Sequence, residues 1–221
     1  MTTRPAIIAP PPWALTGNGY LFLCHFPQAF VEKHGFLADY QQVAYDGWIG
    51  SVMFVDYHDT PVGPYQELLF IPGFFKLGNQ RTFSISKIYV STYESVWNGL
   101  ENWAIPKELA EFRVEKIDDY HDRLLALHNG EPFFDVTVQK HAFSFPMTTA
   151  LFPLRITQKQ PNGQLLLTKP SAKGKARLAK ITQMTINAQY FPDLAQVRPL
   201  AVLAVEGFEM KFPEPSLLVS Q

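Results

Sequence analysis

The chain of 221 residues contains little cysteine and few charged side chains. Cys24 is the single cysteine, so neither an intrachain disulfide nor a zinc site built on several cysteines can form. It lies in an apolar run at residues 20–26, which favours a packed thiol over a nucleophile. Charged residues make up 18% of the chain, compared with roughly 25% in an average domain, and this indicates a large apolar interior.

An excess of either charge and a long apolar run are also absent. Nineteen basic and twenty acidic side chains give a formal net charge of −1, which disfavours nucleic acid and anionic membrane as partners. No run approaches the roughly 18 apolar residues of a membrane-spanning helix. Prolines at positions 10–12 interrupt the N-terminal apolar stretch too early for a signal peptide. We therefore expect a cytosolic protein without nucleic-acid or membrane partners.

The length suits a single domain at residues 13–221, preceded by an extended arm at residues 1–12, and two small domains are the alternative. The three prolines of the arm favour a polyproline II conformation. A domain of this size buries roughly 70% of its unfolded surface, so it needs neither a disulfide nor a metal ion to fold.

Strand patterns dominate the rest of the chain. Residues rich in β-branched and aromatic side chains and bounded by Gly and Pro predict strands at 20–26, 48–57, 65–71, 82–91 and 200–210. The Asn-Gly pairs at 129–130 and 162–163 predict hairpins with type I′ turns. Residues 175–190 fit either a strand or a helix, and the basic stretch at 169–180 is expected to be a solvated loop.

Helical patterns are few and short. Residues 27–34 predict a short helix that ends at Gly35. Apolar side chains at helical spacing predict a second helix from residue 93 to 104, which ends before Pro106. Many strands, antiparallel hairpins and few helices predict a mostly β fold, in which a curved antiparallel sheet or a closed β-barrel surrounds the core.

Two motifs carry the chemical information of the chain. The first is residues 62–68 (VGPYQEL), and the second is residues 99–108 (GLENWAIPKE). Their order and spacing resemble those of the acetoacetate decarboxylase-like family, and the resemblance spans about residues 13–212. It implies the family's cone-shaped β-barrel with a central active-site cavity. We expect a homo-oligomer that acts on a small-molecule oxo compound and needs no metal or other cofactor.

The resemblance implies that Lys107, which follows a proline, forms a covalent imine with a ketone. The attacking amine must be neutral, but at an ordinary pKa of about 10.4 only roughly one lysine in a few thousand is neutral at pH 7. Desolvation or a nearby cation must therefore lower the pKa. Trp103 and Ile105 are apolar neighbours suited to desolvating Lys107, and we expect both to line the substrate site.

Glu67 matches the carboxylate of the family's cavity. Tyr65 and Glu67 are two residues apart on a predicted strand and so face the same side. The apolar residues that follow indicate that Glu67 points inward, where it can transfer a proton during imine formation. A structural ion pair is the alternative interpretation of Glu67. Tyr65 is expected to contact the substrate.

The sequence departs from the family pattern at two places. Glu108 replaces the second lysine of the motif, and a carboxylate beside Lys107 would raise the pKa of the amine, so we expect Glu108 to point away. Leu100 replaces an arginine, and residues 16–20 also lack the arginine that meets the substrate carboxylate in the decarboxylases. His25 or Arg113 are candidate substitutes. Acetoacetate itself is therefore not the expected substrate.

These observations predict a lyase that acts on a small or medium oxo compound through a Schiff base on Lys107. An aldolase or dehydratase using the same imine is one alternative. A non-catalytic β-barrel that binds a small apolar molecule is another, and a structural oligomer without chemistry is the last.

Overall fold

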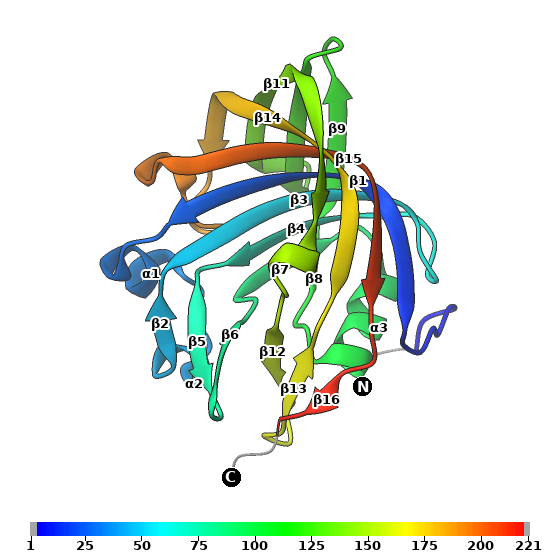
Figure 1. The fold of residues 1–221 in the computed structure, drawn as a ribbon, viewed down its shortest axis with the longest axis vertical. Helices are drawn as coiled ribbons and strands as arrows, with labels where there is room; N and C mark the ends of the chain where they lie inside the picture. The colour runs from blue at the N-terminus through cyan, green and yellow to red at the C-terminus, as the bar shows by residue number, and fades with distance from the viewer. Residues whose placement is uncertain (1–3, 219–221) are drawn as a thin grey trace.

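The computed structural model describes residues 4–218, and the first three residues of the predicted arm lie outside this range. Within it, sixteen strands accompany three α-helices and two short 3-10 helices, which confirms the predicted mostly β fold (Figure 1). The helices are α1 (Gln28–His34), α2 (Asp39–Gln42), α3 (Tyr93–Trp103) and the 3-10 turns Thr149–Leu151 and Leu194–Gln196. None of the helices in the described part of the chain is long and apolar enough to cross a membrane.

A large sheet of ten strands forms most of the molecule. Its members are β1 (Trp13–His25), β3 (Ile49–Asp59), β4 (Tyr65–Ile71), β7 (Lys87–Val90), β8 (Glu108–Leu109), β9 (Glu111–Lys116), β10 (His121–His128), β11 (Glu131–Thr148), β14 (Ser171–Ile186) and β15 (Pro199–Phe212). Their order in space is β8-β7-β4-β3-β1-β15-β14-β11-β10-β9. The edge strands β8 and β9 are joined by Ala110 alone, whose N–H donates to the Val90 carbonyl at 3.0 Å. The sheet therefore curls round and nearly closes into a barrel.

A second sheet of six strands lies below the curved strands in Figure 1. Its members are β2 (Tyr45–Gly47), β5 (Phe74–Leu77), β6 (Gln80–Phe83), β12 (Ile156–Lys159), β13 (Leu165–Thr168) and β16 (Ser216–Leu217). Their order is β16-β13-β12-β6-β5-β2.

Strands β3 and β4 contribute to two separate apolar cores. Side chains alternate between the two faces of a strand. Phe54 and Leu68 pack with side chains of β10 and β11 inside the curled sheet. Val55 and Leu69 belong to the second core, which also contains side chains of α3 and of the second sheet. Two cores in one chain account for the low fraction of charged residues.

Several predicted elements are confirmed with nearly the same bounds. The predicted strand at residues 65–71 is β4, and the predicted helix at 93–104 is α3. Asn129 and Gly130 both have positive φ, at 52° and 79°, as a type I′ turn requires. These elements depend on residues that are close together in the chain, so they can be predicted from the sequence.

The run at residues 82–91 was predicted as one strand, and this is wrong because it divides between β6 and β7, which belong to different sheets. The Ile85 carbonyl, between the two, accepts hydrogen bonds from the side-chain amides of Gln41 and Gln158, each at 3.0 Å. These side chains replace the partners that a continuous ladder would supply, so the chain can leave one sheet and enter the other.

The turn at Asn162 and Gly163 was predicted as type I′, and this is also wrong. Of the two residues only Gly163 has positive φ, at 89°, and its N–H donates to the Gln160 carbonyl at 2.9 Å. The turn therefore runs from Gln160 to Gly163, with Pro161 at its first central position. The proline ring holds φ at about −65° and excludes the positive φ that a type I′ turn needs there.

The basic segment at residues 169–180 is not a solvated loop, because it forms the first part of β14 from Ser171 onward. Lys173 and Lys175 are exposed, whereas Ala176 is fully buried. The lysines therefore mark the solvent-facing side of a strand, and residues 175–186 are extended rather than helical.

The described part of the arm, residues 4–12, lies in no helix or strand and is held against α3. The Ala9 N–H donates to Asn98 Oδ1 at 2.9 Å, and Asn102 Nδ2 donates to the Ala9 carbonyl at 2.8 Å. Strand β1 begins at Trp13, earlier than the predicted residue 20. The arm thus helps to fix the helix that carries the second motif.

Candidate active site

The end of α3 determines where Lys107 lies. Ala104 ends the helix in the left-handed region at φ 56°, and its N–H donates to the carbonyls of Gly99 and Leu100. The chain then turns, and the Lys107 N–H donates to the Ile105 carbonyl at 2.9 Å. A Cβ at Gly99 would lie 2.8 Å from Lys107 Cε and 2.9 Å from Cδ. The glycine of the second motif therefore provides the space in which the lysine stem packs.

The Lys107 amine is buried among polar groups. Nζ donates to Glu67 Oε2 at 2.8 Å and to Ser95 Oγ at 3.0 Å. It also lies 5.2 Å from the centre of the Tyr65 ring. The side chains of Lys107 and Glu67 are each 6% exposed. The geometry agrees with the expected contact between the two motifs and places it away from bulk water.

Glu67 is held by a tyrosine on the neighbouring strand. Its Oε1 accepts a hydrogen bond from the Tyr57 hydroxyl at 3.3 Å. Burial, and next the negative charge of Glu67, raise the pKa of Tyr57 well above its ordinary value. Burial raises the pKa of Tyr65 to about 12, although the Lys107 ammonium acts in the opposite direction. Both tyrosines are therefore neutral at physiological pH, and Tyr57 is the donor to Glu67.

The electrostatics of Lys107 differ from what imine chemistry was expected to need. Burial by itself lowers the pKa of Lys107, but the Glu67 carboxylate and the Tyr65 hydroxyl raise it, and the net direction is upward. The expected lowering of the pKa is therefore wrong for the resting protein. Lys107 and Glu67 form an ammonium–carboxylate pair.

Glu108 does not take part in this pair. Its carboxylate is 53% exposed and accepts from Lys87 Nζ at 2.6 Å. It is directed to Lys87 on the neighbouring strand β7 and so away from Lys107, as expected. The raised pKa of Lys107 is thus caused by Glu67 and Tyr65 and not by the departure from the family motif.

Trp103 and Ile105 are buried in the apolar core that also contains Tyr65. Trp103 Nε1 donates to the Pro213 carbonyl at 2.8 Å. The ring packs edge-on against Trp13 at 5.0 Å and against Phe212 at 4.9 Å between centroids. Trp103 therefore joins α3 to both ends of the domain, and Ile105 supports the turn before Lys107.

His25, predicted to contact substrate, is not brought to this site. Glu67 pairs with Val55, and Val55 pairs with Gly19 on β1. His25 lies six residues beyond Gly19, or about 20 Å along the strand. It is exposed and lines a different cavity with Asp46. The apolar pattern of β1 could not reveal which end of the strand adjoins Glu67.

The other proposed substitute for an arginine, Arg113, is exposed on β9 and pairs with Leu125. It is not among the contacts of Lys107. The contacts that sequence reasoning missed are Ser95 and Tyr57. Neither has a motif signal, because each reaches the pair only through the packing of α3 and the pairing of β3 with β4. Within residues 4–218 no three His, Cys, Asp or Glu side chains are arranged to hold a metal ion.

No protein-family model and no curated protein matches the sequence. Solved structures do match the fold. Acetoacetate decarboxylase from Legionella pneumophila has a TM-score of 0.70 and 10% identity, covering 99% of this chain and 92% of its own. An acetoacetate decarboxylase-like enzyme from Sphingomonas wittichii has a TM-score of 0.69 and 10% identity, covering 97% of this chain and 95% of its own.

The enduracididine biosynthesis enzyme MppR, complexed with the condensation product of pyruvate and imidazole 4-carboxaldehyde, is a third match. It has a TM-score of 0.68 and 11% identity, covering 96% of this chain and 91% of its own. In all three cases the similarity extends over nearly the whole of both chains. The protein thus has the acetoacetate decarboxylase-like fold.

Proposed function

We propose that this protein is a lyase that acts on a small or medium oxo compound through an imine on Lys107. The observation that carries the proposal is the buried contact of Lys107 Nζ with Glu67 Oε2 at 2.8 Å, in an acetoacetate decarboxylase-like fold. A lysine and a carboxylic acid at hydrogen-bond distance are the two groups that imine formation needs.

The raised pKa of Lys107 requires that the neutral amine form inside the pair. Transfer of the proton from Lys107 to Glu67 gives an amine and a carboxylic acid with no change in net charge. Burial favours this transfer, since it disfavours both charged forms. The hydrogen bond from Tyr57 to Glu67 supports the carboxylate and acts in the opposite direction. A carbonyl compound that displaces the remaining polar contacts of Lys107 would favour the neutral pair.

The chemistry then proceeds through groups already in contact. The Lys107 amine attacks the carbonyl carbon and forms a carbinolamine. The proton held by Glu67 passes to the carbinolamine hydroxyl, water leaves, and an iminium remains beside the Glu67 carboxylate. The iminium accepts the electron pair of a neighbouring C–C bond, so that a β-keto acid loses carbon dioxide and leaves an enamine. Protonation at carbon and hydrolysis by water release the product and Lys107.

Acetoacetate is expected to be a poor substrate. Neither His25 nor Arg113 contacts Lys107, so neither of these two candidates is placed to bind the carboxylate of a substrate on Lys107. A bidentate arginine supplies both energy and orientation to such a contact. Steady-state assays should give a kcat/KM on acetoacetate below about 10⁴ M⁻¹s⁻¹, the lower end for ordinary enzymes. A higher value would reveal an anion site elsewhere among the residues around Lys107.

The direct test is to trap the imine. Borohydride added with a panel of ketones, keto acids and aldehydes should leave a reduced adduct on Lys107, detected by intact mass and located by peptide mapping. Lys140 is a matched internal control, because it is also buried and paired, with Asp122 at 2.5 Å. Adduct on Lys107 without adduct on Lys140 supports the proposal.

Two alternative functions predict different results in the same experiment. An aldolase or dehydratase would form the same adduct, and incubation of an adduct-forming ketone with an aldehyde would give a condensation product instead of carbon dioxide. A non-catalytic binding barrel is favoured by the raised pKa of Lys107 and would give no adduct with any carbonyl compound. Absence of adduct across the panel would therefore replace the lyase proposal with the binding one.

A further inference from the structure

The face of the large sheet that carries Glu67 is lined by apolar side chains. Directly paired residues of adjacent antiparallel strands share a face, so the register defines rows of neighbouring side chains. The row through Glu67 runs across β4, β3, β1, β15 and β14 and consists of Glu67, Val55, Gly19, Val205 and Ala176. The next row, here called the apolar row, consists of Leu69, Met53, Leu21, Leu203 and Leu178.

The apolar row becomes more exposed with distance from Glu67. Leu69, which is two residues from Glu67 on β4, is 7% exposed. Met53, Leu21 and Leu203 are partly exposed, and Leu178 is 52% exposed. The row therefore starts beside the buried pair and ends at the surface. Its five members carry no charge.

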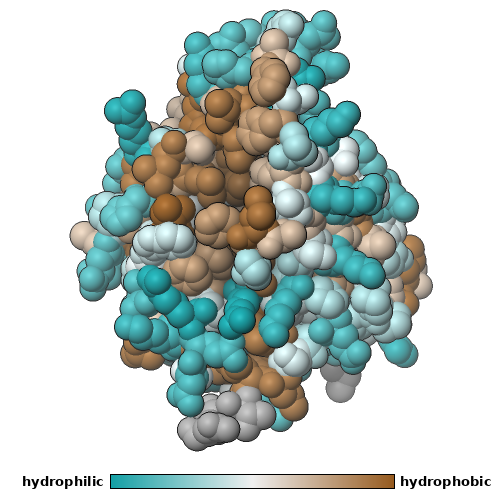
Figure 2. Space-filling model, viewed as in Figure 1, coloured by the Kyte–Doolittle hydropathy of each residue, from teal (hydrophilic) through white to brown (hydrophobic). Residues whose placement is uncertain are grey.

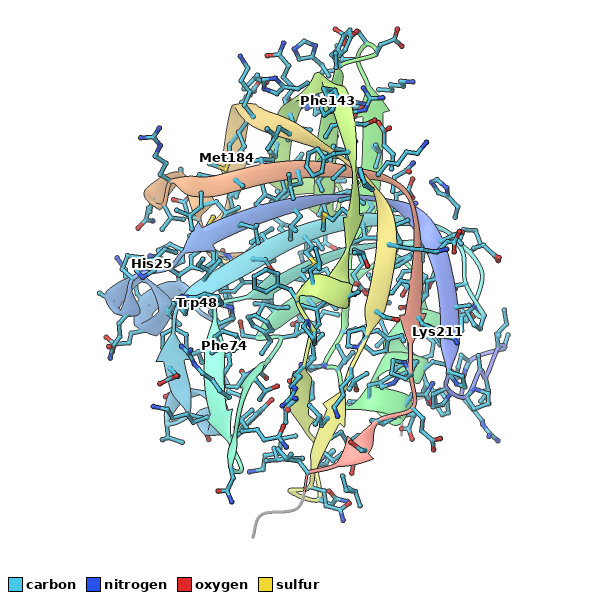
Figure 3. The ribbon with its side chains drawn as sticks, viewed as in Figure 1. His25, Trp48, Phe74, Phe143, Met184 and Lys211 are labelled. Atoms are coloured by element: carbon cyan, nitrogen blue, oxygen red, sulfur yellow. The ribbon has the colours of Figure 1, made fainter. Side chains whose placement is uncertain are left out.

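The same surface is visible in the space-filling view. Figure 2 shows a hollowed apolar area in the middle of one face, where β15, β1 and β3 run side by side. Phe143, Trp48 and Phe74 lie around it on the same face of the molecule (Figure 3). Trp48 and Phe74 stack at 5.2 Å between ring centres.

Gly19 gives the row of Glu67 a position without a side chain. Gly19 stands two strands away from Glu67, and a Cβ there would meet its nearest atom at 3.4 Å. The Cβ position at Gly19 is thus already in ordinary contact with the Phe54 carbonyl and, at 3.8 Å each, with the side chains of Phe208 and Val55. The apolar row and the row of Glu67 lie on one face of the large sheet, so both belong to the wall beside Glu67.

We propose that the apolar row binds a hydrocarbon substituent of the oxo compound, so that the substrate class is ketones with an extended aliphatic chain. This inference rests on the proposed function, because it assigns the carbonyl end to Lys107. Neighbouring strands lie about 4.8 Å apart, so the part of the row from Leu69 to Leu21 spans about 10 Å. A ketone chain that follows this direction replaces water on Met53 and Leu21 and is stabilised by the hydrophobic effect.

The test uses straight-chain methyl ketones from 2-butanone to 2-octanone. Each methylene that enters the row should strengthen binding about threefold to fourfold, the factor that corresponds to about 0.8 kcal/mol per buried methylene. Dissociation constants come from ligand-observed NMR without borohydride. Half-saturating concentrations for the trapped Lys107 adduct come from intact mass. The same NMR series on the Lys107→Met/Glu67→Gln double variant measures chain binding without imine formation.

Substitutions locate the binding. Leu21→Gln and Met53→Gln, each checked for folding by circular dichroism, should remove most of the dependence on chain length. The matched control is Ile117→Gln, at a 58% exposed aliphatic residue in the turn after β9, which should keep that dependence. Two row variants are used so that a folding defect in one does not decide the outcome.

The outcomes separate this inference from the proposed function. Dependence on chain length in the double variant, with no adduct on Lys107 of the wild-type protein, would support the apolar row and refute the imine. Adducts on Lys107 that form equally well with 2-butanone and 2-octanone would support the imine and overturn the apolar row. Unchanged chain dependence in both row variants would also overturn it. So would a fall in solution mass on Leu21→Gln without discrimination among ketones, because the row would then be a subunit contact.

Discussion

The pair of Lys107 and Glu67 combines two opposing electrostatic effects. Burial disfavours the charged form of each group, whereas their contact at 2.8 Å favours the charged forms together. Burial is the largest single influence on the pKa of Lys107 and lowers it, but the contacts with Glu67 and Tyr65 together outweigh burial, so the pKa is raised. The carboxylate that would serve as proton carrier therefore also holds the amine in its unreactive form.

The first prediction concerns the direction in which Glu67 shifts the pKa of Lys107. In Glu67→Gln the pKa of Lys107 should fall, because burial remains and the opposing carboxylate is gone. A lysine-selective NMR titration should place the midpoint of Lys107 below its value in the wild-type protein. Glu108→Gln is the control, because Glu108 pairs with Lys87 instead, and it should leave the midpoint unchanged. A midpoint that stays or rises in Glu67→Gln would contradict this account.

The same shift has a consequence for stability. The folded-state pKa of Lys107 lies above its unfolded value of about 10.4, so the pair stabilises the fold at neutral pH. This contribution is fully present below the unfolded pKa and is lost as the pH rises through the folded pKa.

The second prediction concerns the removal of one or both charges. Lys107→Met leaves Glu67 buried without its cation and should lower the free energy of unfolding by about 3–5 kcal/mol. The double variant Lys107→Met/Glu67→Gln removes both charges and should recover most of that loss. Urea unfolding measures both. Lys87→Met, which breaks the more exposed pair with Glu108, is the control and should change stability by at most about 1 kcal/mol. A double variant as unstable as Lys107→Met would show that the charge is not the cause.

At the scale of elements, the end of α3 positions the chemistry. The helix ends at a left-handed Ala104, and the chain returns so that Lys107 packs across Gly99. The arm is bound to the same helix, because Ala9 donates to Asn98, Asn98 donates to the Ile7 carbonyl and Asn102 donates to the Ala9 carbonyl. The lysine is therefore held by a helix that is itself held by the N-terminal segment.

The third prediction tests this packing. Alanine in a helix is normally more stable than glycine by about 0.5–1 kcal/mol. Gly99→Ala should bring no such gain, since its Cβ would lie 2.8 Å from Lys107 Cε. Moving Nζ by about 1 Å should slow adduct formation by roughly a hundredfold. Borohydride trapping over time measures the rate, and urea unfolding measures the stability. Glu101→Ala, at an exposed position of the same helix, should leave trapping unchanged. Equal rates in both variants would show that Gly99 does not position Lys107.

At the scale of the whole molecule, the curved ten-stranded sheet contributes side chains to two apolar cores, one on each of its faces. The first core is closed by β9–β11, and it contains a second buried polar group in which the Tyr20 hydroxyl donates to Asp122 at 2.6 Å. The second core includes Tyr65 and Leu69, which lie on either side of Glu67 on the same face of β4. Burial on both faces of β3 and β4 gives these strands a rigid setting for the candidate site.

The fourth prediction concerns assembly, which stays a prediction from the sequence. Several large apolar side chains are well exposed, among them Phe143 at 77%, Leu151 at 81% and Phe152 at 73%. Exposed apolar surface of this kind is typical of interaction sites. Light scattering coupled to gel filtration should give a mass that is a multiple of 25.1 kDa and greater than one chain. A mass of one chain at micromolar concentration would exclude the expected homo-oligomer under these conditions.

The sequence by itself determined the elements whose causes are local. The bounds of β4, the end of α3 before Pro106 and the type I′ turn at Asn129 follow from residue pattern and backbone chemistry. The contact of Glu67 with Lys107 was also predictable, because the two motifs together imply one site. The mostly β architecture followed from the number of strands and hairpins.

Only the tertiary structure decided which distant segments meet. The partition of residues 82–91 between two sheets depends on Gln41 and Gln158, which lie far away in the chain. The packing of α3 places Ser95 beside Lys107, and the register of β1 places His25 away from it. Neither the helix packing nor the strand register can be recognised in the local sequence. The sign of the pKa shift of Lys107 was decided in the same way. Burial lowers this pKa, whereas the contacts with Glu67 and Tyr65 raise it. The net direction depends on distances between these groups, which are set only in the folded chain.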